Sequence, residues 1–343
     1  MTVKRINLAL QGGGAHGAFT WGALDVLLSD SRIEIGAMSG TSAGALNAAA
    51  VKAGLVAGGP DGARENLNWL WEQVAGQQDI SMGQWMLPFG PAQVSHMMEY
   101  SLQFAMGDAF TRMVSPYAYG PFYRNPLTDI VAKFNMDNVC CDDGPRLFIN
   151  ATRVRNGKLR VFAQDEVTPD VIMASACLPT LFQAVRIDDR ETGQVEEFWD
   201  GGYTGNPALF PLFDTALPDD IVVININPLE REVMPRTPQQ IQNRINEISF
   251  NSSLLREMRA INFVQRLLDD GTLPEGRMAR VLMHMIADDD LMNDLSVATK
   301  TVPNGYVIGN LKEAGERAAR AFLQAHFDDL GHQSSIDLPS MFS

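Results

Sequence analysis

Cysteine is scarce in this sequence of 343 residues, which contains only Cys140, Cys141 and Cys177. Adjacent cysteines rarely bridge each other, and the three lack the spacing of a zinc site. A low, odd number of cysteines argues against a disulfide-stapled secreted domain and is typical of a reducing compartment. We therefore expect no metal site and no cofactor.

Long apolar runs are also absent. No stretch of about 20 apolar residues occurs, so length excludes a membrane-spanning helix. The first residues, Met1 to Arg5, pass directly into an apolar strand, which leaves no room for the apolar segment of a signal peptide. We expect a cytoplasmic protein, with any contact to a membrane or lipid surface being peripheral.

Basic residues are few, since 27 Lys and Arg stand against 41 Asp and Glu, for a formal net charge of −14. This charge argues against nucleic-acid binding, because phosphates attract cations, and against adhesion to an anionic bilayer by charge. Contact with a membrane or a lipid droplet would therefore have to be made by apolar side chains. Composition predicts no particular oligomeric state.

A large core can form, because 45% of the residues are hydrophobic. Strand patterns and helical patterns, separated by glycines, alternate through about residue 75. Such alternation is typical of a parallel sheet covered by helices. We predict an α/β fold, a three-layer sandwich with a mostly parallel central sheet flanked by helices.

The pentapeptide Gly40-Thr41-Ser42-Ala43-Gly44 has the form GxSxG and lies between the apolar run 33–38 and the alanine-rich helical stretch 43–53. In a nucleophile elbow the chain turns sharply from strand to helix, so the serine is strained and its neighbours must be small. The turn would place the Ser42 hydroxyl at the positive end of the helix, where developing negative charge is stabilised. An ordinary turn with Ser42 as N-cap explains the same pattern.

A second glycine-rich turn, Gly12-Gly13-Gly14-Ala15-His16-Gly17, follows the apolar strand 6–10. Successive glycines leave backbone N–H groups uncovered, and two such donors aimed at one point form an oxyanion hole. The hexapeptide also fits the Gly-x-Gly-x-x-Gly turn of dinucleotide-binding proteins. That alternative needs an acidic residue at the end of the second strand, whereas Glu34 lies at its start.

A third motif, Asp200-Gly201-Gly202, follows the short apolar stretch Phe198-Trp199. Aspartate followed by glycines at a strand end is often only a turn. In this chain, however, a carboxylate that a parallel sheet brings beside Ser42 could accept the hydroxyl proton during attack. The residues therefore suggest a serine–aspartate dyad.

The three motifs together resemble the patatin-like phospholipase family in their order and spacing along most of residues 5–228. The segment 174–180 also resembles the Ala-Ser-x-x-x-Pro stretch that precedes the base motif in that family. The resemblance implies cleavage of carboxylic esters of lipids through an acyl-enzyme, with Ser42 as nucleophile and Asp200 as base. It also implies that backbone amides around Gly13 and Gly14 hold the oxyanion.

Two positions depart from the family pattern. His16 stands where many members carry Arg or Lys, which removes a fixed positive charge from the glycine loop near neutral pH. Gln11 stands where plant members often have Asp.

Five histidines are present, and a Ser42–Asp200–His284 triad of the α/β-hydrolase type is the competing interpretation. His284 lies inside the apolar run 281–286, whereas a triad histidine usually comes from a loop. We expect a hydrogen-bonded core histidine there. His16 is expected to shape the oxyanion loop rather than to transfer protons.

Methionines and aromatic residues crowd residues 80–123, where we predict a helical insertion at about 76–130. Such side chains adapt to irregular apolar partners. One interpretation is a helical pair packed on the sheet. The other is a lid or acyl-chain cleft over Ser42, and for that cleft we select Met97, Met98 and Phe104.

The remaining sequence predicts a return to the sheet followed by covering helices. Residues 147–152 and 159–162, joined through Asn156-Gly157, read as a hairpin, and residues 221–226 read as a fully buried strand. Helical apolar spacing in residues 237–270 and 311–327 predicts C-terminal helices covering the sheet within about 237–331. We expect one domain over residues 1–331 and a loose tail over 332–343.

Overall fold

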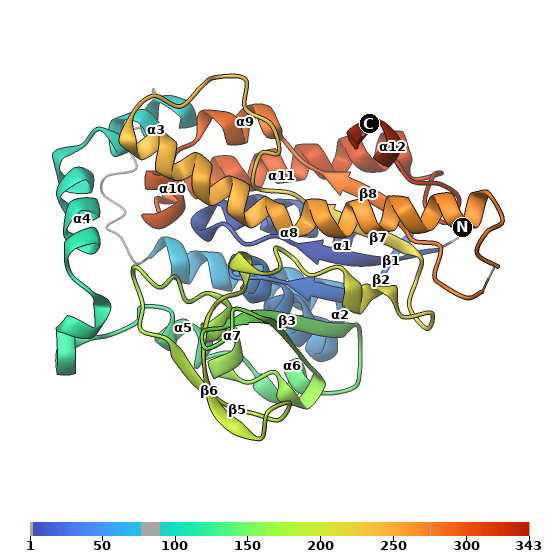
Figure 1. The fold of residues 1–343 in the computed structure, drawn as a ribbon, viewed down its shortest axis with the longest axis horizontal. Coiled ribbons are helices and arrows are strands. Elements are labelled where there is room, and N and C mark those ends of the chain that lie inside the picture. The colour runs from blue at the N-terminus through green and yellow to red at the C-terminus, as the bar shows by residue number, and fades with distance from the viewer. Residues whose placement is uncertain (1–2, 77–89, 275, 343) are drawn as a thin grey trace.

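A mixed eight-stranded sheet lies at the centre of the computed structural model, which describes residues 3–76, 90–274 and 276–342 (Figure 1). The strand order is β5-β6-β3-β2-β1-β7-β8, and β4 pairs with β3 outside this path. The strands are β1 (Lys4–Leu10), β2 (Ile33–Gly40), β3 (Arg146–Arg153), β4 (Leu159–Ala163), β5 (Val185–Asp189), β6 (Gln194–Asp200), β7 (Asp220–Ile224) and β8 (Leu282–Ile286).

Strands β3, β2, β1, β7 and β8 are parallel, whereas β4, β5 and β6 pair antiparallel. The hairpin predicted around Asn156-Gly157 is present as β3–β4. The predicted buried strand is present as β7, all of whose residues are buried. The mostly parallel sheet is confirmed, and its antiparallel part is confined to the edge that includes Asp200.

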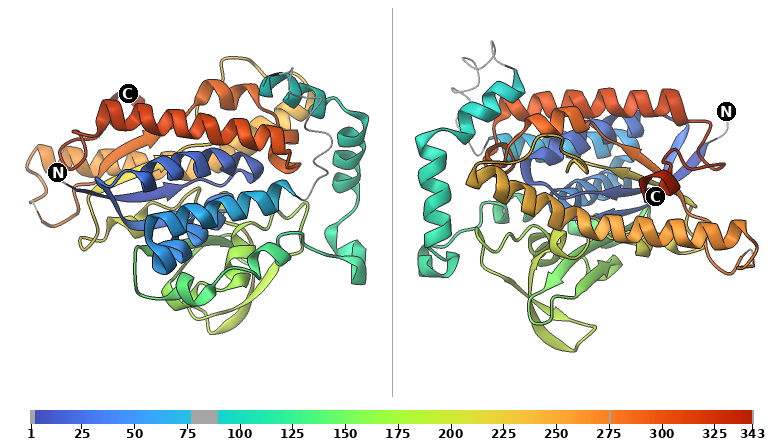
Figure 2. Two further views of the ribbon diagram at one scale, coloured as in Figure 1. Left: turned by 180° about the vertical axis from the view of Figure 1, so that it is seen from behind. Right: turned by 45° about the horizontal axis from the view of Figure 1, so that its top comes forward.

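Helices cover both faces of the sheet, so the predicted three-layer α/β fold is confirmed (Figure 2). Helices α1, α2 and α11 pack on one face and α8 and α12 on the other. The helices are α1 (Gly17–Ser29), α2 (Ala43–Ala75), α3 (Pro91–Glu99), α4 (Leu102–Met113), α5 (Thr128–Val131), α6 (Met136–Cys140), α7 (Pro169–Ser175), α8 (Pro238–Asp269), α9 (Asp289–Asp294), α10 (Val297–Thr301), α11 (Gly305–His326) and α12 (Leu338–Met341), with short 3₁₀ turns η1 (Gly14–His16), η4 (Pro116–Phe122), η5 (Gln164–Glu166), η6 (Gly201–Tyr203) and η7 (Phe210–Phe213).

The alternation of side chains along β1 explains the two layers. Ile6, Leu8 and Leu10 join the larger hydrophobic core under α1, α2 and α11, whereas Ala9 joins the second core under α8. Successive strand residues point to opposite faces, so one apolar strand supplies both cores. In the described part of the chain, no helix combines the length and apolarity needed to cross a membrane.

Residues 90–131 leave the sheet as a helical arch built from α3, α4, η4 and α5. At one end Ser95 on α3 accepts a hydrogen bond from the N–H of Ser296 over 2.8 Å. At the other, the hydroxyl of Tyr117 accepts one from the N–H of Ala184 over 3.0 Å. Helix α4 lies between these anchors, beyond the carboxyl ends of the parallel strands (Figures 1 and 2). Residues 77–89 of the predicted insertion lie outside the described residues.

The C-terminal residues pack against the domain rather than forming the expected loose tail. The N–H of Met283 on β8 donates to the hydroxyl of Ser334 over 3.0 Å, and its carbonyl accepts from Ser335 N–H over 3.1 Å. Leu338 is buried in the second core. Strand β8 is an edge strand, and this segment provides hydrogen-bond partners for the backbone N–H and carbonyl of Met283.

Candidate active site

Ser42 occupies the sharp turn between β2 and α2, with φ 55° and ψ −121°. A non-glycine residue held at positive φ is strained, and such strain is typical of a nucleophile elbow. Close packing explains the flanking glycines. A Cβ at Gly44 would lie 2.1 Å from the Leu10 carbonyl oxygen, and one at Gly40 would lie 2.6 Å from the Gly44 carbonyl oxygen. The GxSxG pattern is therefore required by the backbone at this turn.

Asp200 lies at the end of β6 and is fully buried. Its Oδ1 accepts a hydrogen bond from the Gly202 N–H over 2.7 Å, whereas Oδ2 has no partner among the described residues. Burial raises the pKa of the Asp200 carboxyl to about 7, opposed by the Gly202 N–H and by the hydroxyl of Ser42. The Ser42 hydroxyl therefore lies near enough to this carboxyl to favour its ionised form.

Gly12 brings the glycine loop against the serine but offers no free donor. A Cβ at Gly12 would lie 2.6 Å from the Cβ of Ser42. Its N–H donates to the side-chain oxygen of Asn206 over 2.7 Å, so Gly12 cannot supply the oxyanion donor that we predicted for it. In the part of the chain that the structure describes, the N–H groups of Gly13 and Gly14 have no protein acceptor.

His16 and Gly17 hold the loop in place. The buried His16 ring makes a hydrogen bond through Nε2 to the Thr299 hydroxyl over 2.9 Å. Burial, together with the positive charges of Lys300 and Arg231, holds the pKa of His16 well below its ordinary value, so the ring is neutral near pH 7. A Cβ at Gly17 would lie 2.7 Å from the Cβ of Ala43, which shows how closely the two glycine-rich turns pack.

The C-terminal end of α7 and the residues after it contact both Ser42 and Asp200. The Ser175 hydroxyl accepts a hydrogen bond from the Ser42 N–H over 2.9 Å, and the Cys177 carbonyl accepts one from the Asp200 N–H over 2.8 Å. The sequence indicated this segment only through its resemblance to the family and predicted neither contact. Asn150 was also missed, although its side chain accepts from the Thr41 hydroxyl over 2.7 Å; a polar residue within an apolar strand was the available signal.

The competing triad is not assembled. His284 Nε2 lies 3.0 Å from Asp220 Oδ1, and Nδ1 lies 3.1 Å from the Ser335 hydroxyl. Asp220 is the first residue of β7, whereas Ser42 lies two residues after the end of β2. Because β7 and β2 run parallel within one sheet, these residues lie at opposite ends of it. His284 is a hydrogen-bonded core histidine.

The dinucleotide alternative also lacks its acidic residue. Glu34 pairs with Arg5 at the amino ends of β1 and β2, over 3.1 Å. The carboxyl end of β2 leads into Thr41 and Ser42 instead of an acidic side chain.

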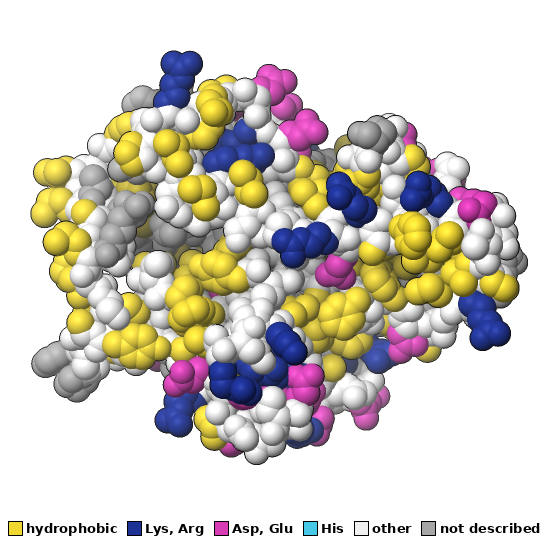
Figure 3. Space-filling model, in the orientation of Figure 1, with side chains coloured by type: hydrophobic (Ala, Val, Ile, Leu, Met, Phe, Trp, Pro, Cys, Tyr) yellow, Lys and Arg dark blue, Asp and Glu magenta, His cyan; other side chains and the backbone are white. Residues whose placement is uncertain are grey.

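The three residues selected for an acyl-chain cleft do not share one environment. Met98 packs against the main core, Met97 is exposed and Phe104 is half-buried. Helix α4 instead exposes several large apolar side chains along the margin where Figure 3 shows hydrophobic groups: Leu102, Met106, Phe110 and Met113.

Two solved structures are similar to this chain over most of its length. A crystal structure of VipD from Legionella pneumophila is 15% identical, with a TM-score of 0.41, and the match covers 94% of this chain and 67% of that one. A structure of ExoU with SpcU from Pseudomonas aeruginosa is 12% identical, with a TM-score of 0.31. The match covers 94% of this chain but only 53% of the ExoU–SpcU structure's matched chain. A comparison with curated proteins gives no match.

The family model described as "Patatin-like phospholipase" matches residues 8–213, more than half of the chain. The match includes the glycine loop, the GxSxG turn and the Asp200 motif. This chain belongs to the patatin-like phospholipase family.

Proposed function

We propose that this protein is a lipid acyl hydrolase in which Ser42 is the nucleophile and Asp200 the general base. Membership of the family implies action on lipid esters. The observation that carries the assignment of residues is the strained Ser42 beside a buried carboxyl on which its hydroxyl acts. A base whose pKa lies near the working pH combines a large ionised fraction with sufficient basicity.

The backbone amides of Gly13 and Gly14 are the proposed oxyanion donors. Gly14 has φ +58°, and the loop is held beside Ser42 by Gly12. Unpaired N–H groups that are already oriented stabilise the charge that develops on the carbonyl oxygen without further reorganisation.

In this mechanism the Ser42 oxygen attacks the ester carbonyl while Asp200 takes the hydroxyl proton. The tetrahedral intermediate collapses to an acyl-enzyme, and Asp200 returns the proton to the departing alcohol. Asp200 then takes a proton from water as its oxygen attacks the acyl-enzyme carbonyl, and returns that proton to the Ser42 oxygen as the fatty acid leaves.

Apolar side chains of α4 support a peripheral contact with a membrane or lipid droplet. Met106, Phe110 and Met113 are 64%, 51% and 86% exposed, beyond the same ends of the strands that carry the dyad (Figure 1). Exposed contiguous apolar groups are typical of a surface that binds a partner or a lipid phase, and the net charge of −14 favours a neutral or zwitterionic one.

The test compares wild type with Ser42→Ala, Asp200→Asn and the matched control Ser29→Ala, whose hydroxyl only bonds to the Val26 carbonyl at the end of α1. The substrates are p-nitrophenyl esters and phosphatidylcholine vesicles, with fluorophosphonate labelling as a second measurement. We expect Ser42→Ala to lose turnover and labelling, and Asp200→Asn to lose about 10³-fold or more in kcat. Ester turnover that persists in Ser42→Ala would falsify the proposal.

A further inference from the structure

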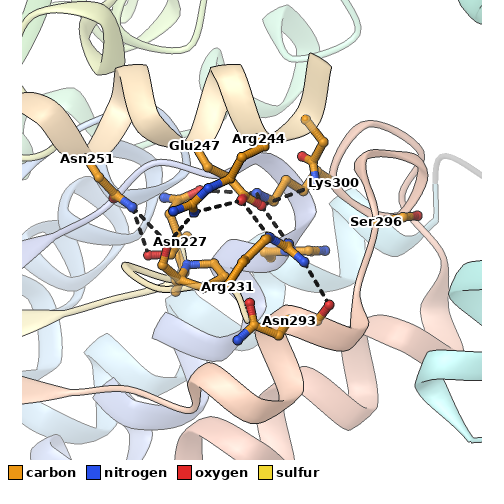
Figure 4. Close-up of polar contacts among 12 residues, drawn as sticks. Asn227, Arg231, Arg244, Glu247, Asn251, Asn293, Ser296 and Lys300 are labelled. Atoms are coloured by element: carbon orange, nitrogen blue, oxygen red, sulfur yellow. Dashed lines mark hydrogen bonds and ion pairs between the residues drawn. The ribbon is translucent and has the colours of Figure 1, made fainter. Parts of the chain in front are cut away.

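A cluster of charged side chains, which includes Arg231, Glu247 and Lys300, lies outside the proposed dyad (Figure 4). Arg231 makes two hydrogen bonds to the carboxylate of Glu247, of 2.8 and 2.7 Å. Arg244 lies 3.4 Å and Lys300 3.5 Å from the same carboxylate. Three cationic side chains thus surround one anionic one.

Positive charge predominates in this cluster and is largely shielded from water. Glu247 is 1% exposed, and the side chains of Arg231 and Lys300 are 18% and 14% exposed. The cluster carries a formal charge of +2. Glu99 on α3 also interacts electrostatically with Arg231. When Glu99 is counted as well, the net formal charge of the cluster is still positive. Charges that are screened little by water act over longer distances than surface charges do.

Lys300 connects this cluster to the glycine loop. Its ammonium donates to the side-chain oxygen of Asn227 over 3.2 Å, and the Asn227 amide donates to the Gly12 carbonyl over 2.8 Å. The Lys300 carbonyl lies so close to Gly14 that a Cβ there would approach it to 2.2 Å. The neighbouring Thr299 bonds to His16. One short helix, α10, therefore contacts the loop directly at Gly14 and His16 and reaches Gly12 through Asn227.

The loop itself has no cation. Its only titratable side chain, His16, is neutral, and the positive charges of Lys300 and Arg231 contribute to that neutrality. Any positive side chain that acts on the loop therefore comes from outside it, as Lys300 and Arg231 do on His16.

We propose that Lys300 is a positioning residue for the oxyanion loop, and that the cationic surplus it shares with Arg231 and Arg244 stabilises the negative charge formed there. This inference rests on the proposed function, because it concerns the same intermediate. Burial lowers the pKa of Lys300 and the Glu247 carboxylate opposes that shift, so the cluster supplies from α8, α10 and the loop after β7 positive charge that the glycine loop lacks.

The experiment changes the charge of the cluster in opposite directions. Lys300→Met lowers the formal charge to about +1 and Glu247→Gln raises it to about +3, while both break buried ion pairs. The kcat and KM of each variant are measured on a p-nitrophenyl ester. The concentration of active enzyme is determined by titration with a fluorophosphonate, so that unfolded protein does not lower the measured kcat. Lys158→Met, in the exposed β3–β4 turn, is the control for loss of a lysine.

We expect Lys300→Met to lower kcat about tenfold with little change in KM, less than the cost of about 10²-fold or more for a direct oxyanion donor. Lys300→Arg should recover part of that loss, and Glu247→Gln should raise kcat about twofold. Equal losses in Lys300→Met and Glu247→Gln would show that the cluster is only a structural brace. A wild-type kcat in Lys300→Met would also overturn the proposal.

A second measurement does not depend on turnover. In NMR titrations of histidine-labelled protein, Lys300→Met should shift the pKa of His16 upward, because a positive neighbour is removed, and Lys158→Met should not. An unchanged His16 would show that the cluster does not act on the loop. If wild type has no activity that depends on Ser42, the proposed function fails, and this titration still decides whether Lys300 acts there.

Discussion

The backbone N–H of Ser42 donates a hydrogen bond to the side-chain oxygen of Ser175, over 2.9 Å. Ser175 is the last residue of α7, and two residues later the Cys177 carbonyl holds the N–H of Asp200. A single segment thus sets the position of both proposed catalytic residues relative to each other. The geometry of the dyad depends on this segment as much as on the two turns.

Replacing Ser175 with alanine should therefore slow the reaction without removing it. The Ser42 N–H would lose its acceptor within a buried turn, at a cost of about 1–3 kcal/mol, and the strained conformation would be less well held. We expect kcat to fall about tenfold and Tm to decrease. The measurements are steady-state kinetics and thermal unfolding, with Ser29→Ala as the control. A Ser175→Ala enzyme with wild-type kcat would contradict the role given to this contact.

The activity should depend on pH through Asp200. Its pKa is raised to about 7 by burial, so the carboxyl is protonated below that pH and cannot accept the Ser42 proton. We expect kcat/KM on a p-nitrophenyl ester to rise about tenfold between pH 6 and pH 8 and then to level off. A profile that is flat over this range would exclude a base with this pKa.

The same buried carboxyl should cost stability. Because the folded pKa of Asp200 lies above its ordinary value of 3.8, the folded protein binds more protons than the unfolded chain, and this group lowers the free energy of unfolding as pH rises from about 4 to about 7. Asp200→Asn keeps an acceptor for the Gly202 N–H and removes the buried charge. We expect its Tm to exceed that of wild type at pH 8, by a margin that shrinks toward pH 5.

The exposed Asp214 provides the contrasting variant for that measurement. Arg146 and the Ala216 N–H hold the pKa of Asp214 below its ordinary value, so its ionised form is favoured by folding and is lost as pH falls. Asp214→Asn should leave the Tm at pH 8 unchanged or slightly lower. If Asp200→Asn also has a Tm below that of wild type at pH 8, the buried carboxylate does not destabilise the fold.

Helix α4 should affect the reaction only at a lipid surface. Burying one large apolar side chain in a lipid phase is worth about 1.5–3 kcal/mol, so Phe110→Glu and Met106→Glu should each weaken binding to phosphatidylcholine vesicles about tenfold or more. Hydrolysis of a soluble short-chain ester should not change. Vesicle sedimentation and the two assays measure this, with Val195→Glu on the β5–β6 hairpin as the control. Equal losses on soluble and vesicle substrates would argue against surface docking.

The acyl-chain cleft at Met97, Met98 and Phe104 stays a prediction, and replacing these residues with polar ones should weaken turnover of long-chain esters more than of short-chain ones if it is right. Met98 packs against the core, so its replacement also lowers the stability of the fold. The kcat of that variant is therefore expressed per titrated active site. Met97 and Phe104 provide the cleaner test. Equal losses for all chain lengths would count against an acyl-chain cleft.

Local patterns were enough to predict the layers, the hairpin and the two glycine turns. These patterns extend over only a few residues: the alternation of apolar residues in strands, glycines between elements, and the Asn-Gly turn. Strands β1 and β2 and the β3–β4 hairpin lie where those patterns occur. The tail was predicted wrongly because nothing in its own sequence indicates that an edge strand needs its backbone partners. That information lies about 50 residues away, in β8.

Some features of the candidate site follow from chain neighbours alone: a serine at positive φ needs small flanking residues, and adjacent glycines expose their N–H groups. Others depend on residues that meet only after folding. The use of the Gly12 N–H by Asn206, the support of Ser42 by Ser175 and the packing of the Lys300 carbonyl against Gly14 each join positions more than 130 residues apart. Hydrogen bonds and burial between such distant positions have no periodicity along the chain, so the packed structure is needed to reveal them.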